Sequence, residues 1–371
     1  MNAERLHAIA AALRADLTNS DVQSQFQQLV SALQNQVNQP GDPTYQQQVS
    51  QHYAALRTAL ENAESNAFSP TWMQVLDEIG AGELLGEKLA QRIQEVFSRN
   101  QITPSVALQD LRLISDQLQA LTAALDQLLA SFKQLVVGAE ELPAGDCEVG
   151  ILVPRAFVDN RLDKFSEELS ELNQIFGVFS EVATGSRPGF EIRAISSSDL
   201  SIFLDAAPVV GACVAVAIER IIALYKQLLE IRKIQGELVK QGLEKENLKG
   251  IEKHANSVMD NGIDKVVKEL LTEFHKVDDS GRKNELSIEL KYALKKIANR
   301  VDRGFNIEVR MTEPEEVENE EGSKEDNHVK EQSKHHTRIA SAAETLQFLK
   351  LEGEPILSLT EEKPERVKKS Q

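Results

Sequence analysis

Apolar residues in the first 140 positions recur every three or four residues, the spacing of amphipathic α-helices. The longest row follows Thr103 and comprises Leu111, Ile114, Leu118, Leu121, Leu125, Leu128, Phe132 and Leu135. This alternation keeps one seam of a helix facing a partner, as in coiled coils. The positions that flank the seam carry few charges. The pattern therefore favours packing against the chain's own helices, with self-association as the second alternative.

Proline and glycine punctuate this helical region. The stretch QPGDP (Gln39–Pro43) interrupts the apolar spacing, which then resumes, as expected for two helices joined in an αα-hairpin. Ser69 and Thr103 each stand before a proline, which indicates a hydroxyl cap followed by proline in the first helical turn. We predict an α-helical, coiled-coil-like bundle over residues 1–140.

The pattern changes near Gly145, where short apolar runs of strand character begin. Three such runs lie in GDCEVGILVPR (145–155), FEIRAIS (190–196) and FNIEVRM (305–311), and a helical stripe separates the first two. Strand, helix and strand in succession indicate a βαβ unit with a right-handed crossover. We predict a small α/β domain over 146–311, with helices in excess and a long central helix over 206–240. The fold class is α+β or mixed, and predominantly helical.

The end of the chain changes composition again. Residues 312–336 are rich in glutamate and poor in apolar side chains, so we expect an acidic disordered segment. Over residues 337–371 we expect a short helix (339–349), a strand (355–359) and a charged tail.

The stretch SIFLDAAPVVGACVAVAIERII (201–222) has two interpretations. Its length and apolar content are near those of a membrane-spanning helix, which would cover 202–224. However, the pattern turns amphipathic after Ile218, and Asp205 with Pro208 is typical of the first turn of a helix inside a folded domain. We favour a buried helix and keep membrane insertion as the alternative.

Composition narrows the range of partners. The chain has 58 acidic and 41 basic side chains and a formal net charge of −17, so a nucleic-acid backbone would be repelled. Cys147 and Cys213 form no C-x-x-C pair, which fits a reducing compartment, and the first residues lack the apolar core of a signal peptide. We expect a cytoplasmic protein that does not bind nucleic acid.

Known catalytic and cofactor motifs do not fit. GAGELLG (Gly80–Gly86) resembles a dinucleotide fingerprint, but Leu85 stands where the third glycine is required. The seven histidines show no zinc-binding spacing. In VDDSGRKN (277–284), Lys283 stands at the sixth position from Asp278, where a calcium loop requires glycine. We predict no metal site and no cofactor. Whether the chain is an enzyme stays open, because triads assemble from residues distant in sequence.

One polar site is suggested around the second predicted strand. Its candidate residues are Ser186, Arg187, Arg193, Ser196, Ser197, Ser198 and Asp199. In open α/β sheets, ligands gather beyond the carboxyl ends of strands, where backbone amides and hydroxyls can hold an anion. Helix capping by Asp199 or a serine is the competing explanation.

These observations favour a non-enzymatic assembly or adaptor protein. It would act through helix-mediated protein–protein interaction, with a protein partner or by self-association. The first alternative is a membrane-associated effector that inserts residues 202–224. The second is an enzyme whose site lies near Arg193 and Ser196 to Asp199.

Overall fold

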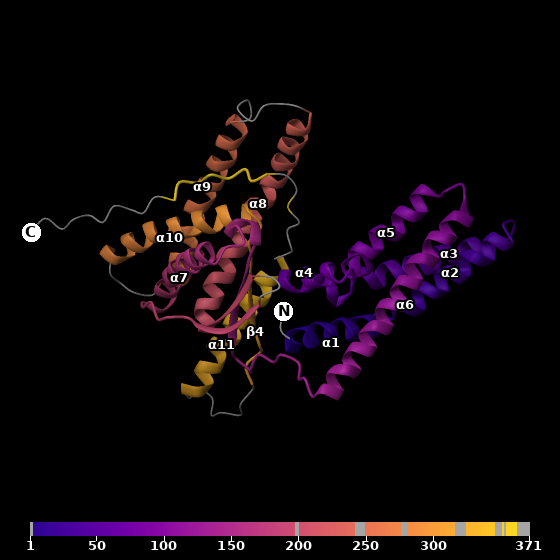
Figure 1. The fold of residues 1–371 in the computed structure, drawn as a ribbon, viewed down its shortest axis with the longest axis horizontal. Helices are drawn as coiled ribbons and strands as arrows, with labels where there is room; N and C mark the ends of the chain where they lie inside the picture. Colours follow the sequence, from indigo (N-terminus) through magenta and orange to yellow (C-terminus); the bar gives the residue numbers. More distant parts are fainter. Residues whose placement is uncertain are drawn as a thin grey trace, which may run out of the picture. The chain divides into compact units, whose positions relative to one another are not determined.

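The computed structural model describes residues 3–196, 200–241, 249–275, 280–315, 324–345, 351 and 354–361. Among them it is mostly helical (74%), with 11 helices and a four-stranded antiparallel sheet, an α+β fold. The chain divides into two compact units, Met1–Glu141 and Leu142–Gln371 (Figure 1). We call them the helical unit and the sheet unit.

The helical unit follows the punctuation of the sequence. Its helices are α1 (Ala3–Asn19), α2 (Val22–Asn38), α3 (Pro43–Glu61), α4 (Pro70–Glu78), α5 (Gly86–Arg99) and α6 (Pro104–Leu135). The predicted αα-hairpin is confirmed, because α2 and α3 pack together and the Asp42 side chain accepts the Thr44 N–H at 2.9 Å. The predicted cap at Ser69 is also confirmed, since its hydroxyl accepts the Trp72 N–H at 3.3 Å. Thr103 occupies the cap position of α6 without a side-chain cap bond.

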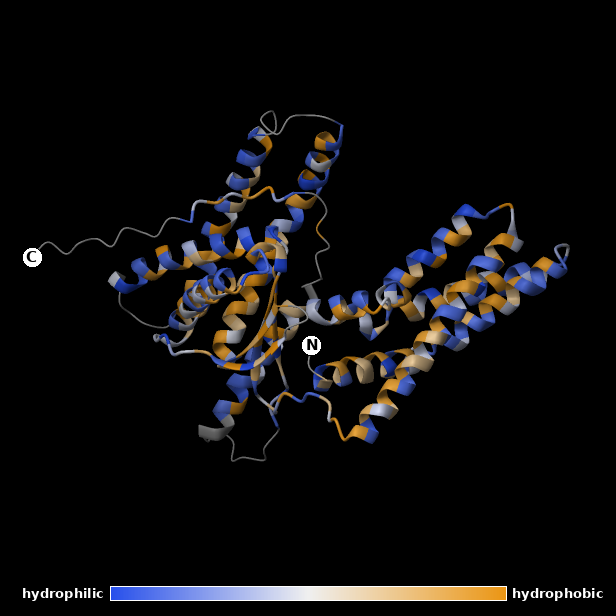
Figure 2. Ribbon diagram, in the orientation of Figure 1, coloured by the Kyte–Doolittle hydropathy of each residue, from blue (hydrophilic) through white to orange (hydrophobic). Residues whose placement is uncertain are grey.

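The apolar seam of α6 faces the helical unit itself. Leu111, Ile114, Leu118 and Leu125 are buried, and α6 contacts α1, α2 and α5. Figure 2 shows apolar and polar residues alternating along α6. The seam ends before Leu135, which is 73% exposed.

The sheet unit contains four described strands. They are β1 (Cys147–Val153), β2 (Glu191–Ser196), β3 (Leu200–Ala206) and β4 (Asn306–Met311). Their order is β2-β3-β1-β4, and every neighbouring pair is antiparallel. β1 and β2 therefore run in the same direction with β3 between them. This is the split βαβ arrangement, in which helix α7 (Leu162–Thr184) connects β1 to β2.

The expected α/β domain with a simple βαβ unit is thus corrected to an α+β unit with an antiparallel sheet. Strand β3 was missed, because its apolar residues run directly into those of the next helix. Asp205 lies on β3 and not in a first helical turn, and helix α8 (Pro208–Lys240) begins after it. Consequently, residues 202–224 are not one helix but parts of a strand and a helix.

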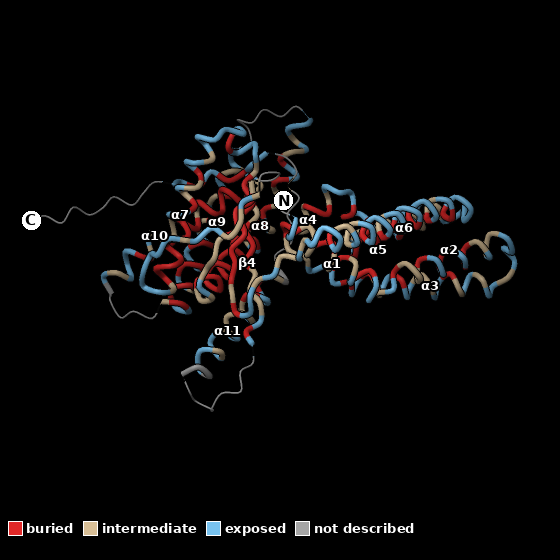
Figure 3. Tube along the Cα trace, turned by 60° about the horizontal axis from the view of Figure 1, so that its bottom comes forward, coloured by how far each residue is buried: buried red, intermediate tan, exposed pale blue. Residues whose placement is uncertain are grey.

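Helix α8 lies at the centre of the sheet unit. It contacts α7, β1 and β4, together with α9 (Lys249–Glu273), α10 (Ser280–Asp302) and α11 (Lys324–Thr345). Every residue from Val210 to Ile218 is buried, as Figure 3 shows for the red part of α8 beside the sheet. By length and composition α8 is the one helix in the described ranges that is able to cross a membrane. In this structure the chain's own side chains cover its apolar half.

Two features near the C-terminus differ from expectation. α11 begins at Lys324, inside the segment for which we expected disorder, and residues 316–323 lie outside the described residues. Residues 354–361 carry neither helix nor strand, although we expected a strand at 355–359. The side chains of Ile356, Leu357 and Leu359 are nevertheless buried in the core of the sheet unit.

Gly211 permits the close approach of α8 to the sheet. A methyl group in its place would overlap Cys147 Sγ and lie 3.3 Å from Val309 Cγ1. Since all three residues are buried, the neighbours have little room to move.

We predict that Gly211→Ala lowers the free energy of unfolding by about 1–3 kcal/mol, because it overpacks this contact. The cost should be smaller in a Cys147→Ala background, where the overlapping sulfur is gone. Chemical denaturation of the four chains of this double-mutant cycle measures the coupling. Gly189→Ala, with nothing within 4 Å of the added methyl group, is the control. An equal cost of Gly211→Ala in both backgrounds would contradict the packing argument.

Candidate functional site

The predicted site residues bond to two different sets of partners. Ser186 and Arg187 follow the end of α7, whereas Arg193 and Ser196 lie on β2. Ser197, Ser198 and Asp199 lie outside the described residues.

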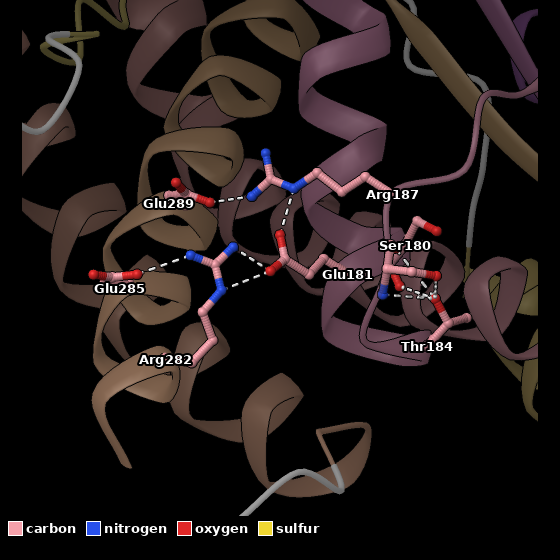
Figure 4. Close-up of polar contacts among 8 residues, drawn as sticks. Ser180, Glu181, Thr184, Arg187, Arg282, Glu285 and Glu289 are labelled. Atoms are coloured by element: carbon pink, nitrogen blue, oxygen red, sulfur yellow. Dashed lines mark hydrogen bonds and ion pairs between the residues drawn. The ribbon is translucent and has the colours of Figure 1, made fainter. Parts of the chain in front are cut away.

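Glu181 near the end of α7 is the centre of the first set (Figure 4). Its carboxylate accepts hydrogen bonds from Arg187 and from Arg282 of α10, whose Nε lies 2.7 Å from Glu181 Oε1. Arg187 also pairs with Glu289, and Arg282 donates to Glu285 at 2.8 Å. We call these five residues the Glu181 cluster. It links α7 to α10.

Ser186 takes part in the turn beside this cluster. The Ser186 N–H donates to Thr184 Oγ1 at 3.3 Å, and the Thr184 hydroxyl donates to the Ser180 carbonyl at 2.8 Å. Gly185 between them adopts φ 78°, in the left-handed region that favours glycine. Ser186 thus has a local structural role in ending α7.

The electrostatics of the Glu181 cluster favour the ionised carboxylate. Burial is the largest influence on Glu181 and acts to raise its pKa. The hydrogen bonds from Arg282 and Arg187 together outweigh burial, so the pKa lies below the ordinary value of 4.5. A carboxylate held in this state is a poor proton donor at neutral pH. The cluster is therefore suited to joining helices and not to acid catalysis.

We predict that Glu181→Gln lowers the free energy of unfolding by about 1–2 kcal/mol at pH 7, because two arginines lose their charged acceptor. A lowered folded-state pKa contributes stability above the ordinary value of 4.5, and this stability is lost as pH falls through the lowered value. The difference between wild type and variant should therefore shrink below pH 4.5. Denaturation at a series of pH values measures it.

Glu285→Gln is the control, because Glu285 is exposed and bonds to Arg282 at the edge of the cluster. It should cost only a few tenths of a kcal/mol, about the value of a surface ion pair. A Glu181→Gln deficit that stays constant from pH 7 to pH 3 would argue against the charge-based explanation.

Arg193 is the centre of the second set, on the polar face of the sheet. It leaves β2 at a bulge, and its Nε donates to Asp205 Oδ1 at 2.6 Å while Nη2 donates to Asp146 Oδ2 at 3.0 Å. Glu148 Oε2 lies 3.9 Å from Arg193 Nε, and Glu148 Oε1 accepts from Arg310 Nη2 at 2.6 Å. The strand register explains this grouping, because Glu148 pairs directly with Asp205 on one side and Arg310 on the other.

The charge balance of this second set bears on the anion-site hypothesis. Burial is the largest influence on Arg193 and acts to lower its pKa, but hydrogen bonds to Asp205 and Asp146 outweigh burial and raise it. Three carboxylates, those of Asp146, Glu148 and Asp205, surround the guanidinium. An anion would have to displace one of them. The hypothesis of an anion site at Arg193 therefore gains no support from the geometry.

A third group of polar side chains was missed by sequence reasoning. Asn256 of α9, with Asn299 and Asp302 of α10, accepts hydrogen bonds from the main chain of residues 354–361. In Figure 1 this segment is the yellow trace that runs across α9. Asn299 and Asp302 are 3% and 0% exposed. Single polar residues on helices give no pattern that predicts such a role. The only signal was the apolar run Pro355–Leu359 within a charged tail.

Asp302 is held in place from a second side by α8. Its Oδ1 accepts from the Tyr225 hydroxyl at 2.6 Å and from Arg232 Nη1 at 3.0 Å. Arg232 Nη1 also donates to the Asp302 carbonyl at 2.7 Å. Burial, followed by the charge of Asp302, raises the pKa of Tyr225, so its hydroxyl stays a donor at neutral pH.

Metal binding and thiol chemistry find no geometric support. In the part of the chain that the structure describes, no group of three or more His, Cys, Asp and Glu side chains is placed to hold a metal ion. Burial raises the pKa of Cys147 to about 12 and also raises that of Cys213. Both thiols therefore remain protonated at neutral pH, which makes them poor nucleophiles.

Comparison with known protein families, curated proteins and solved structures finds no match to this chain.

Proposed function

We propose that this chain is a non-enzymatic assembly or adaptor protein that acts through helix-mediated protein–protein interaction. The observation that carries the proposal is a row along the outer side of α6, away from its buried seam, in which exposed apolar side chains alternate with the polar residues Asp110 and Gln117. Val106 is 42% exposed and Leu113 is 62% exposed, one heptad apart on the same side of the helix. Ile102 before the helix is 94% exposed.

The row continues with small side chains. Ala120 and Ala124 are exposed further along α6, so the backbone of a second helix can approach closely there. Single exposed apolar residues are common on protein surfaces, but a row at helical spacing is typical of helix-packing surfaces. We therefore propose that α6 receives a helix on this side, either from a partner protein or from a second copy of the chain.

Geometry gives less support to the two alternatives that the sequence left open. For the membrane-associated effector, insertion would require the apolar half of α8 to leave the neighbours that now cover it. For the enzyme, Arg193 would have to release carboxylates that it already binds. The adaptor proposal needs no such rearrangement.

We predict that the double substitution Val106→Glu and Leu113→Glu weakens association through α6 by about 10- to 100-fold, because charges replace apolar contacts. Sedimentation velocity measures self-association, and quantitative capture with the tagged chain measures partners. Gln119→Glu adds a charge to α6 at an exposed position off the row and is the control. A wild-type chain that remains a single copy and captures no partner would overturn the proposal.

A further inference from the structure

The C-terminal segment, residues 354–361, is bound to the sheet unit as a peptide ligand is bound to a receptor. Its backbone forms no helix and joins no described strand. Instead, four consecutive N–H groups donate to side-chain oxygens of α9 and α10. The N–H groups of Ile356 and Leu357 donate to Asp302 Oδ2 at 2.8 and 2.6 Å. Those of Ser358 and Leu359 donate to Asn256 Oδ1 at 2.9 Å and Asn299 Oδ1 at 3.0 Å.

Asn299 binds the segment at more than one point. Its Nδ2 donates to the Leu359 carbonyl at 3.0 Å, so one amide side chain binds both main-chain groups of Leu359. The same Nδ2 donates to Glu361 Oε1 at 2.7 Å. Main-chain groups are common to all residues, so these bonds provide affinity with little dependence on sequence.

Sequence preference comes from three aliphatic side chains. Ile356 and Leu357 are each 2% exposed and Leu359 is 7% exposed, whereas Ser358 and Thr360 are exposed. The groove therefore takes an extended segment with two adjacent aliphatic residues and a third two positions later. Proline is excluded at the positions whose N–H groups are bound.

The residues that form the groove lie on helices outside the C-terminal segment. Asn256 lies on α9, Asn299 and Asp302 lie on α10, and Asp302 is further held by Tyr225 and Arg232 of α8. Without an occupant, the buried polar atoms of Asn299 and Asp302 would lose partners, which is costly. The groove is thus pre-organised to bind an extended main chain, and the empty groove is energetically unfavourable.

We propose that this groove, formed by Asn256, Asn299 and Asp302, also binds residues 354–361 of a second copy of the chain, so that copies assemble by exchanging this segment. A second copy carries the identical segment, and the contacts within one chain show that this segment fits the groove. The segment makes the same contacts whether it binds the groove of its own chain or that of a second copy. The two states differ only in the path of the tether, the residues that link the segment to α11.

The tether sets the conditions for exchange. Eight residues, 346–353, separate the end of α11 at Thr345 from Glu354, and even fully extended they span only about 26–29 Å. A short tether gives the chain's own segment an effective concentration in the millimolar range, so the segment stays with its own groove in dilute solution. Assembly by exchange then requires a high concentration of chain, or the loss of a chain's own segment from its groove.

Two complementary full-length variants test the proposal. Leu359→Asp places a charge at a buried position, which should reduce occupancy of the chain's own groove about 100-fold and leave that groove open. Asn299→Ala disables the groove and leaves the segment intact. Each variant alone should sediment as a single copy, and an equimolar mixture should form a 1:1 complex. Both carry Val106→Glu and Leu113→Glu, so association through α6 does not contribute.

In the matched control, a Thr360→Ala chain takes the place of the Leu359→Asp chain. The Thr360 side chain is exposed, so the segment of this control chain should stay in its own groove. The control mixture should form no more complex than wild type does. Circular dichroism establishes that each variant is folded. If Asn299→Ala does not fold, Asn256→Ala, at a less buried position, takes its place.

A synthetic peptide of residues 354–361 tests main-chain binding separately. It should bind the Leu359→Asp chain. A Ser358→Ala peptide loses only the exposed bond from Asn256 Nδ2 to Ser358 Oγ at 3.1 Å, so it should bind within about threefold of the unchanged peptide. A Ser358→Pro peptide should bind about tenfold more weakly, because it cannot donate to Asn256. Peptide binding without a complex in the mixture would overturn the second copy as occupant. If the variants are folded but neither peptide binding nor a complex in the mixture is observed, the groove is not a binding site. Neither result depends on the proposal for α6.

Discussion

The stretch from Val210 to Ile218 in α8 is removed from water on all sides, and the rest of the sheet unit is arranged to achieve this. The sheet lies against one side of α8, and α7, α9, α10 and α11 contact the others. Burial of so much apolar surface is the dominant favourable contribution to folding. Small residues, above all Gly211, let α8 approach the sheet closely enough for that burial to be complete.

Several buried charged groups described in this unit are paired, because the apolar core makes unpaired charge costly. Arg300 and Glu168, each 5% exposed at the side chain, form a bidentate pair with distances of 2.6 and 2.8 Å. Glu181 and Arg193 are centres of similar groups at helix ends and on the polar face of the sheet. These pairs connect elements that lie far apart in the chain. Removing one partner of such a buried pair would leave an uncompensated buried charge, which is strongly destabilising.

The two proposed interaction surfaces differ in physical character. The row on α6 offers apolar side chains to another helix, so its affinity would depend on the area removed from water. The groove of the sheet unit binds main-chain groups through Asn256, Asn299 and Asp302. It adds specificity through three aliphatic positions of the segment. If both proposals hold, the chain would have two interaction surfaces whose affinities depend on different physical contributions.

The sequence by itself determined the features that depend on neighbouring residues. The seam of α6, the cap at Ser69 and three of the four described strands follow from spacing and propensity over short windows. Only the tertiary structure decided the position of β3, because strand pairing separates it from the apolar start of α8. It also decided that Arg193 meets Asp146, 47 residues away, and that Asn299 binds Leu359, 60 residues away. Contacts over such separations arise from the packing of whole elements, which no local pattern of residues encodes.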